Sequence, residues 1–368
     1  MPPKLQIKRH LPEIATGLGL MLALYFFLLA VKLIAVSFTL ASQGHVQLLI
    51  ARAGSPLMGL LIGVLCTSLV QSSSSTTSLT VALTVSGALP LNLAIYIVMG
   101  ANIGTCITNV LVSLTHITRR NEFVHAFAAA VVQNFFNLIS VILIFPLEFF
   151  FGYLTRTSGA LAGVVSHVGG IALFKPLDWI TQPAVRLVQN VLDGSPLLIG
   201  LAAAIMLFLS LRRMVVSIKQ LMLYRIRQVF GVYFFKSYGR AMLSGTVITS
   251  IVQSSSVTTS LAVPFAAARV LTLEQIFPYT LGANIGTTVT TLLAALCLGQ
   301  PVGLQIALAH LIFNITGIIL ITPIRGIPIS LARGLALLAT RNRFIPLLFL
   351  LGQFFILPLA VLFSGGRP

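Results

Sequence analysis

Two clusters of hydroxyl and amide side chains stand out, because they lie inside otherwise apolar stretches. The first cluster spans residues 71–78 (Gln-Ser-Ser-Ser-Ser-Thr-Thr-Ser) and the second spans 253–260 (Gln-Ser-Ser-Ser-Val-Thr-Thr-Ser). Unsatisfied polar groups in hydrocarbon are costly, so the clusters must face each other, a cavity or a ligand. Their donors suit a bound anion, and their oxygens suit a desolvated sodium ion. Helix–helix packing explains isolated serines, but a duplicated polar run favours a ligand site.

The chain lacks the patterns that hydrolytic and metal-dependent enzymes use. It contains six Asp and Glu among 368 residues, and none lies in either cluster. This composition disfavours carboxylate catalysis, a proton relay through buried carboxylates and an acidic cage for a hard cation. Neither a Gly-x-Ser-x-Gly elbow nor a Gly-x-x-x-x-Gly-Lys-Ser/Thr loop for ATP is present. We therefore predict that the protein is not an enzyme, that it has no cofactor beyond a coupling ion, and that it holds no transition metal.

The remaining histidines and cysteines are expected to have structural roles. His125 and His310 lie on apolar stretches, where a lone helical histidine usually packs or forms a hydrogen bond. Cys66, Cys106 and Cys297 have no short spacing between them, so neither a disulfide framework nor a zinc site is expected.

Composition and charge place these clusters in a membrane protein. Apolar residues make up 57% of the chain and charged residues 8%, far from the balance of a soluble domain. The net charge of +17 does not indicate nucleic-acid binding, because the lysines and arginines flank long apolar runs. At least five runs are candidate membrane spans: 17–40, 123–152, 303–324, 344–364 and, shorter, 196–211.

Positive charge orients these spans. The segment 212–240 carries seven lysines and arginines and no acidic residue, which places it in the cytoplasm. The same argument places the N-terminus and the Arg119-Arg120 turn inside, and leaves 42–54 and 153–195 outside.

The polar clusters belong to an internal repeat. Residues 67–79 and 249–261 are identical at 11 of 13 positions, and 100–108 and 282–290 at 7 of 9, both with an offset of 182. A weaker match, five residues out of that register, aligns Phe136-Asn137 with Phe313-Asn314. Two matched segments in one register indicate a duplicated structural unit.

The two copies are predicted to point in opposite directions. The first runs from outside to the inside turn at Arg119-Arg120, whereas the second starts inside at 212–240. Serine clusters and Gly-Ala-Asn-Ile-Gly-Thr stretches both disfavour uninterrupted helix, so broken or re-entrant helices are expected in each copy. Inverted repeats of broken helices are typical of secondary transporters, which place one site near the bilayer midplane.

We therefore predict an all-α fold, a polytopic membrane helix bundle with two inverted-topology repeats that contain broken or re-entrant helices. The whole chain, 1–368, is expected to form a single transmembrane transport domain. Its parts are a first half at 17–152 with repeat 1 at about 55–118, an external loop at 153–195, a second half at 196–324 with repeat 2 at about 241–300, and a C-terminal amphipathic segment with the last span at 325–368.

These motifs resemble a known family. Gln-Ser-Ser-Ser occurs twice, each time followed by Gly-x-Asn-Ile-Gly-Thr, as in the type II sodium-dependent phosphate cotransporters and their bacterial relatives. The resemblance covers about 55–152 and 241–324, including the 120–123 turn and the Pro146-Leu147-Glu148 segment. It implies sodium-coupled import of inorganic phosphate by alternating access.

The resemblance also implies a set of site residues. The substrate-binding residues would be Gln71, Ser72, Ser73, Ser74, Gln253, Ser254, Ser255 and Ser256. The sodium-binding residues would be Ser75, Thr76, Asn102, Thr105, Thr258, Asn284 and Thr287.

One position departs from the family pattern. Where electrogenic members have an aspartate that helps to form an additional sodium site, this chain has Asn134. We therefore expect a two-sodium, electroneutral cycle with divalent phosphate, unless Asn134 and Gln133 supply a substitute site. Arg120 and Glu122 are candidates for a gating pair, with a solvated turn as the equal alternative.

The residues alone leave several alternatives open. Hydroxyl and amide donors suit any tetrahedral oxyanion, and the coupling ion could be a proton. A passive anion channel, or a scaffold that uses the clusters for packing, is the alternative from another class. The expected partners are inorganic phosphate, sodium and the lipid bilayer, without nucleic acid, and a homodimer is left open. The expected location is the plasma membrane of a bacterium, its inner membrane, with a cytoplasmic N-terminus.

Overall fold

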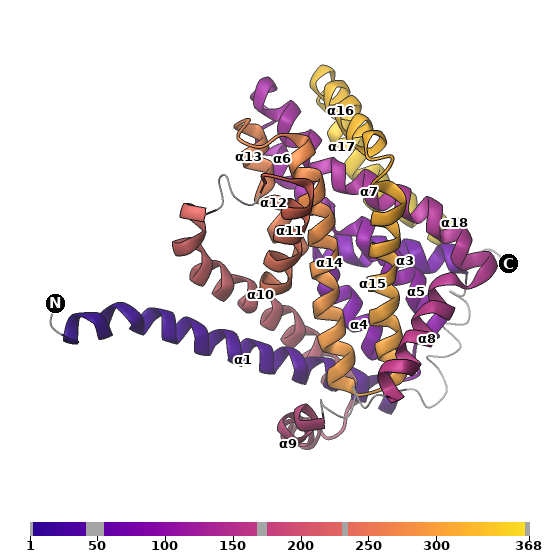
Figure 1. The fold of residues 1–368 in the computed structure, drawn as a ribbon. Helices are drawn as coiled ribbons and strands as arrows, with labels where there is room; N and C mark the ends of the chain where they lie inside the picture. The colour runs from indigo at the N-terminus through magenta and orange to yellow at the C-terminus, as the bar shows by residue number, and fades with distance from the viewer. Residues whose placement is uncertain (1–2, 42–54, 168–174, 230–234, 365–368) are drawn as a thin grey trace.

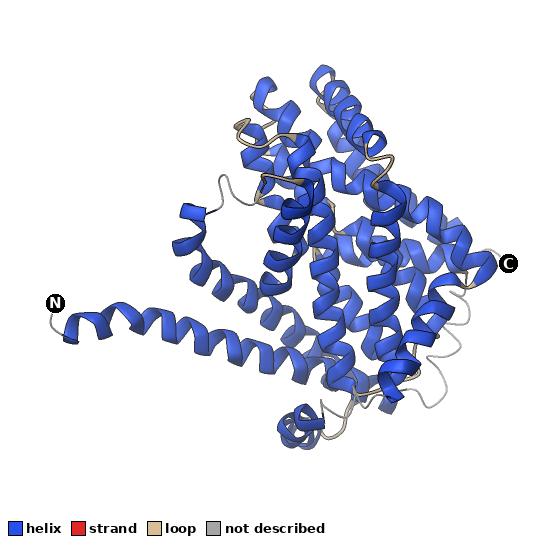
Figure 2. Ribbon diagram, in the orientation of Figure 1, coloured by secondary structure: helices blue, strands red, loops and turns tan. Residues whose placement is uncertain are grey.

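The computed structural model describes residues 3–41, 55–167, 175–229 and 235–364. These ranges are helical almost throughout and contain no strand (Figure 2). The first half comprises α1 (Pro3–Ala41), α3 (Pro56–Val70), α4 (Ser73–Val85), α5 (Leu91–Gly104), α6 (Ile107–Leu114), α7 (Arg120–Phe151), α8 (Tyr153–His167) and α9 (Lys175–Val191). The second half comprises α10 (Pro196–Val229), α11 (Tyr238–Val252), α12 (Ser255–Ser260), α13 (Ala262–Ala267), α14 (Leu273–Leu298), α15 (Pro301–Ile321), α16 (Gly326–Arg341), α17 (Phe344–Leu351), the π-helical segment η2 (Gly352–Ile356) and α18 (Leu357–Ser364).

Seven described segments are long and apolar enough to cross a membrane. Five of them confirm the predicted spans: 16–40, 120–151, 196–214, 301–321 and 344–364. The other two are 91–114 and 273–298, which lie in the stretches that the polar clusters interrupt. The all-α polytopic bundle is therefore confirmed, with more spans than the apolar runs alone revealed.

Each polar cluster forms the tip of a helical hairpin. Gln71 ends α3 in the left-handed conformation (φ 55°, ψ 29°), and Gln253 ends α11 in the same way (φ 56°, ψ 27°). The next residues, Ser72 and Ser254, are extended N-caps of α4 and α12. The chain reverses at these points because a left-handed residue and a capping serine terminate one helix and start another.

Close glycine contacts hold each hairpin against its neighbouring helix. A Cβ atom added at Gly63 would lie 2.0 Å from the Ile97 carbonyl oxygen, and one at Gly245 would lie 2.0 Å from the Tyr279 oxygen. The backbones of α3 and α5, and of α11 and α14, are thus in direct contact, as small residues allow in membranes.

The two hairpins enter the bundle from opposite ends (Figure 1). The helices α7 and α14 begin at the same end, since Val124 and Leu273 line one cavity there. The helix α13 runs to this end and packs Val263 against Ala126 of α7. The helix α4 runs to the other end, where Val81 shares a cluster with Ala295 in the last turns of α14.

One expectation about helix continuity is wrong for the second copy. The first Gly-Ala-Asn-Ile-Gly-Thr stretch does end a helix, since α5 stops at Gly104 and α6 starts at Ile107. The second stretch lies inside α14, which is continuous from Leu273 to Leu298. The expected break at 282–287 is absent because α14 keeps its own backbone hydrogen bonds there.

The segment between the halves is largely helical. Within 153–195, which the sequence predicts as an external loop, the structure describes the helices α8 and α9. Residues 168–174 and the side chain of Trp179 lie outside the described part of the chain. The helix α1 packs along α10, and this pair extends from one side of the bundle (Figure 1).

Candidate functional site

The two hairpin tips meet in the interior of the bundle. The Ser74 hydroxyl donates a 3.0 Å hydrogen bond to the carbonyl oxygen of Gln253, which joins residues 179 positions apart. The Ser256 hydroxyl, the repeat mate of Ser74, donates at 3.5 Å to the carbonyl of Thr105 at the α5–α6 break. The tips therefore contact each other and a helix interruption.

Ser73 and Ser255 carry hydroxyls that the fold leaves available at the two tips. Their residues are 5% and 2% exposed, and neither hydroxyl forms a hydrogen bond with the described residues. The capping serines are differently placed, because Ser72 and Ser254 accept hydrogen bonds from the backbone N–H groups of Ser75 and Val257. Gln71 is exposed at its tip, whereas Gln253 is half-buried.

Most hydroxyls assigned to sodium donate to their own helices. The Thr105 and Thr287 hydroxyls donate to the Ala101 and Ala283 carbonyl oxygens, both at 2.9 Å. Three further donors return to the capping serines: Ser75 to the Ser72 hydroxyl, Thr76 to the Ser72 carbonyl and Thr258 to the Ser254 carbonyl. A hydroxyl that donates its proton keeps oxygen lone pairs that can coordinate a cation.

A chain of polar side chains leads from each hairpin into the helix that follows the opposite repeat. In one, Thr259 donates to Asn109 Oδ1 at 3.0 Å and Asn109 donates to Gln133 Oε1 at 3.0 Å. In the other, the hydroxyls of Thr77 and Thr291 lie 2.8 Å apart.

The second chain continues to a histidine, since Thr291 Oγ1 lies 3.1 Å from His310 Nδ1. Thr77 and Thr259, and likewise Asn109 and Thr291, are related by the repeat offset of 182. Gln133 and His310 are related by 177, the register of the weak Phe-Asn match. His310 therefore has the hydrogen-bonding role expected for it.

The two candidate asparagines differ in their contacts. Asn284 accepts from Gln133 Nε2 at 2.6 Å and donates to Asn137 Oδ1 at 2.7 Å, so it bridges two positions of α7. Asn102 donates to Val98 O on its own helix at 2.9 Å. Asn137 in turn donates to the Asn102 carbonyl oxygen at 2.6 Å.

Asn134 has a partner that the sequence did not reveal. It exchanges two hydrogen bonds with Gln353, at 3.0 and 2.8 Å. Gln353 lies in η2, a π-helical segment of the last span. Segments of π-helix occur frequently at functional sites, but nothing in the sequence pairs two amides 219 residues apart.

Of the two candidates for a gating pair, Glu122 contacts Arg119 and His116 in this structure. The Glu122 carboxylate accepts from Arg119 at 3.1 Å and lies 3.0 Å from His116 Nδ1, whereas Arg120 is exposed as the first residue of α7. The acid is thus paired within its turn, and a role in gating stays a prediction.

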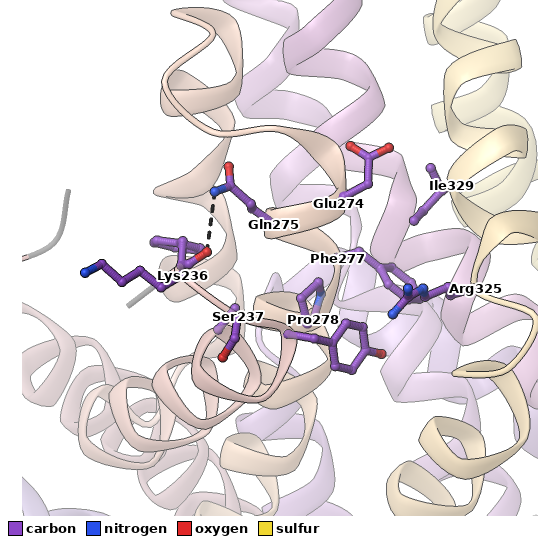
Figure 3. Close-up of a pocket in the computed structure, with 11 residues that line it drawn as sticks. Lys236, Ser237, Glu274, Gln275, Phe277, Pro278, Arg325 and Ile329 are labelled. Carbon is purple, nitrogen blue, oxygen red and sulfur yellow. Dashed lines mark hydrogen bonds between the residues drawn. The ribbon is translucent and has the colours of Figure 1, made fainter. Parts of the chain in front are cut away.

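Three cavities of the described residues lie away from the hairpin tips. One of about 290 Å³ lies where α11, α14 and α16 begin, and its lining includes Arg325, which Figure 3 labels, and the ring of Tyr238. The guanidinium carbon of Arg325 is 5.3 Å from that ring centroid. The described residues contain no group of three His, Cys, Asp or Glu that could hold a metal ion.

Comparison with known proteins gives one family. The model of the Na+/Pi-cotransporter family matches residues 26–174 and 206–356. Sodium-dependent phosphate transport protein 2B of Bos taurus is 32% identical over 93% of this chain and 64% of its own length. Protein 2A of Mus musculus is 31% identical over 97% of this chain and 69% of its own length. The chain thus spans about two thirds of these relatives, and no solved structure matches.

Proposed function

The chain belongs to the Na+/Pi-cotransporter family, and we propose that it is a secondary transporter that imports inorganic phosphate together with sodium. The observation that carries this proposal is the meeting of the two hairpin tips, with the Ser74 hydroxyl on the Gln253 carbonyl. This contact brings the duplicated clusters to one buried place, as a single pseudo-symmetric site requires.

The phosphate is assigned to the tips themselves. Ser73 and Ser255 offer hydroxyls that no described residue occupies, and each begins a helix behind a capping serine. The substrate-binding set is therefore Gln71, Ser72, Ser73, Ser74, Gln253, Ser254, Ser255 and Ser256. Hydrogen bonds to a charged group are stronger than those between neutral groups, so these hydroxyls favour an oxyanion.

Sodium is assigned to oxygens of the hairpins and of the neighbouring helices α5 and α14. The set is Ser75, Thr76, Asn102, Thr105, Thr258, Asn284 and Thr287. Most of these side chains donate their hydrogen bonds to groups of their own helix or of its capping serine. Oxygen lone pairs are then left for a cation, as in other transporters with broken helices. Coupling is required because moving a phosphate with almost two negative charges inward costs roughly 4 to 5 kcal/mol at 100 mV.

We assign an electroneutral cycle of two sodium ions and one divalent phosphate. Asn134 supplies no charge, and its amide is engaged by Gln353 on both its donor and its acceptor side. A third sodium would therefore have to displace a reciprocal amide pair without gaining a carboxylate ligand.

The protein is a multi-pass membrane protein, and we propose that it lies in a bacterial inner membrane with a cytoplasmic N-terminus. The turns α6–α7, α13–α14 and α15–α16 share one end of the bundle (Figure 1). They carry Arg119, Arg269 and Arg325, and Arg120 follows at the start of α7. The turns 86–90 and 299–300 at the other end carry no charge. This asymmetry favours the positive end as the cytoplasmic one.

The deciding experiment is uptake of radiolabelled phosphate into proteoliposomes under three inward gradients, of sodium, of choline and of protons. We expect accumulation above equilibrium with sodium alone. Mere equilibration would favour a channel, and accumulation driven by protons would replace the coupling ion. Competition by unlabelled sulfate and arsenate tests the choice among oxyanions.

The stoichiometry is tested separately by recording current across the same membranes. We expect no phosphate-evoked current at a saturating sodium concentration. An inward current would refute the electroneutral cycle and leave sodium-coupled uptake intact. Cross-linking of the reconstituted protein tests whether the transporter is a homodimer.

A further inference from the structure

The repeat-related contacts of the two halves fall into a matched set and an unmatched set. The matched set contains the two polar chains, Thr259–Asn109–Gln133 and Thr77–Thr291–His310, which have equal order and nearly equal lengths. The unmatched set contains the contacts of Asn284 and of Asn102. These two asparagines occupy equivalent positions at an offset of 182, but they bond to different partners. The halves are thus alike near the hairpins and differ deeper in the bundle.

In one half, an asparagine crosses to the opposite repeat. Asn284 of α14 bonds to both Gln133 and Asn137 of α7, which are four residues apart on one helix face. The equivalent crossing would bring Asn102 of α5 to His310 and Asn314 of α15. That crossing is not formed, because Asn102 donates to Val98 of its own helix.

The two atoms of α15 that this second crossing would use have no partner among the described residues. His310 Nε2 and Asn314 Oδ1 are buried and form no hydrogen bond with the described residues. Their residues are 1% and 0% exposed. An unsatisfied buried polar group is costly, so a state in which both atoms are paired is favoured as a second stable arrangement.

The helices that carry the two bridges cross at equivalent residues. A Cβ atom added to Gly317 of α15 would lie 2.5 Å from Ser140 Oγ of α7, and these positions are related by the same offset of 177. A contact between repeat mates lies on the pseudo-twofold axis. A small rotation about it would lengthen one bridge and shorten the other.

We propose that the transport cycle exchanges one asparagine bridge for the other. In the present arrangement Asn284 joins Gln133 and Asn137, and in the opposite-facing arrangement Asn102 joins His310 and Asn314. Asn314, His310, Asn137 and Gln133 are then positioning residues, which set the populations of the two states without touching phosphate. The inference goes beyond the proposed function, because it concerns the states and not the substrate.

The test measures the accessibility of the two hairpins in variants that lack a residue of one bridge or of the other. Reporter cysteines are placed at Leu69 and Ile251, which are repeat mates, 64% and 50% exposed, near the two tips. A membrane-impermeant thiol reagent is applied to oriented proteoliposomes. The quantity measured is the ratio of labelling at Leu69→Cys to labelling at Ile251→Cys. This ratio is compared between proteins with a bridge substitution and the parent, in which all bridge residues are unchanged.

We expect Asn314→Leu and Asn137→Leu to shift this ratio in opposite directions. Asn314→Leu removes an acceptor of the absent bridge and so favours the present state. Asn137→Leu removes an acceptor of the present bridge and so favours the opposite-facing state. Losing one hydrogen bond of ordinary strength predicts a shift of about two- to tenfold in each direction. Shifts in the same direction, or an unchanged ratio in both variants, would overturn the proposal.

A conservative variant separates positioning from packing. His310→Gln places in α15 the residue that Gln133 supplies in α7, so the labelling ratio should stay near that of the parent. His310→Leu should shift the ratio as Asn314→Leu does, and equal ratios for both His310 variants would contradict the bridge. If a leucine variant does not fold, Asn314→Ser and Asn137→Ser give the same comparison. The readout needs no phosphate, so a failed uptake experiment would leave it interpretable.

Discussion

The two copies of Gly-Ala-Asn-Ile-Gly-Thr have the same six residues and different structures. At Gly100–Thr105 the helix stops and restarts two residues later, whereas at Gly282–Thr287 it continues without a break. In the first copy, the Asn137 amide donates a hydrogen bond to the Asn102 carbonyl oxygen, and the Ser256 hydroxyl donates one to the Thr105 carbonyl oxygen. The N–H of Cys106 donates to the carbonyl oxygen of Ile103, three residues back, and not to that of Asn102, four residues back.

Competition for carbonyl oxygens explains where the helix continues and where it breaks. A glycine-containing helix is only slightly stabilised locally, so two hydrogen bonds from other helices are sufficient to interrupt it. In the second copy no described side chain takes the equivalent carbonyl oxygens of Asn284 and Thr287. The halves of a duplicated protein can therefore share a motif and still present different backbones to a ligand.

The largest effect is expected where the two halves are alike. A Cβ atom at Gly100 would lie 1.9 Å from the Leu60 carbonyl oxygen, and one at Gly282 would lie 1.8 Å from the Met242 oxygen. Gly100→Ala and Gly282→Ala must each separate two backbones, at a cost of about 3 kcal/mol or more. We expect both to lose folded protein, measured as monodisperse yield and Tm in detergent.

Gly334→Ala in α16 is the matched control, because an added Cβ meets nothing within 4 Å there. We expect its Tm to be unchanged or slightly raised, since alanine lowers the conformational entropy of the unfolded chain. Tolerance of one of the two core substitutions alone would show that only one hairpin is in close contact with its neighbour.

The second prediction concerns the two available hydroxyls at the tips. Ser73→Ala and Ser255→Ala each remove a donor to a charged ligand, which predicts a loss of phosphate transport of about tenfold or more. The measurement is the initial rate of sodium-driven uptake over a range of phosphate concentrations. Folded yield should stay at the parent level, because neither hydroxyl bonds to a described residue.

Ser86→Ala and Ser260→Ala are the controls for the two hairpins. Their hydroxyls donate to the Leu83 and Val257 carbonyl oxygens of their own helices, so uptake should be nearly unchanged. Parent-level uptake in Ser73→Ala or Ser255→Ala would assign that serine to packing. A defect in only one of them would break the symmetry of the proposed site.

The smallest effect is expected at a feature that one half lacks. Glu122 pairs with Arg119 and His116 in the α6–α7 turn, whereas the repeat mate of Glu122 is the uncharged Gly299. Arg119 is 73% exposed, and exposed ion pairs contribute little. We expect Glu122→Gln to change the uptake rate by less than about twofold. A change of tenfold or more would instead support a gate at this turn.

The sequence by itself determined the membrane class, the duplicated clusters and the opposite directions of the repeats. Each of these follows from local composition or from a fixed offset, so no knowledge of contacts was needed. It also indicated that the helices break within each copy, because serine caps and a polar run act on the adjacent backbone, and the structure places one break in each copy at Gln71 and at Gln253.

Only the tertiary structure decided how the halves differ. The break at Thr105 and the continuity of α14 depend on carbonyl oxygens taken by Asn137 and Ser256, which are distant in sequence. The pairing of Asn134 with Gln353 spans 219 positions and has no local signature. Identical motifs have identical local preferences, so a difference between them can arise only from the residues that surround them.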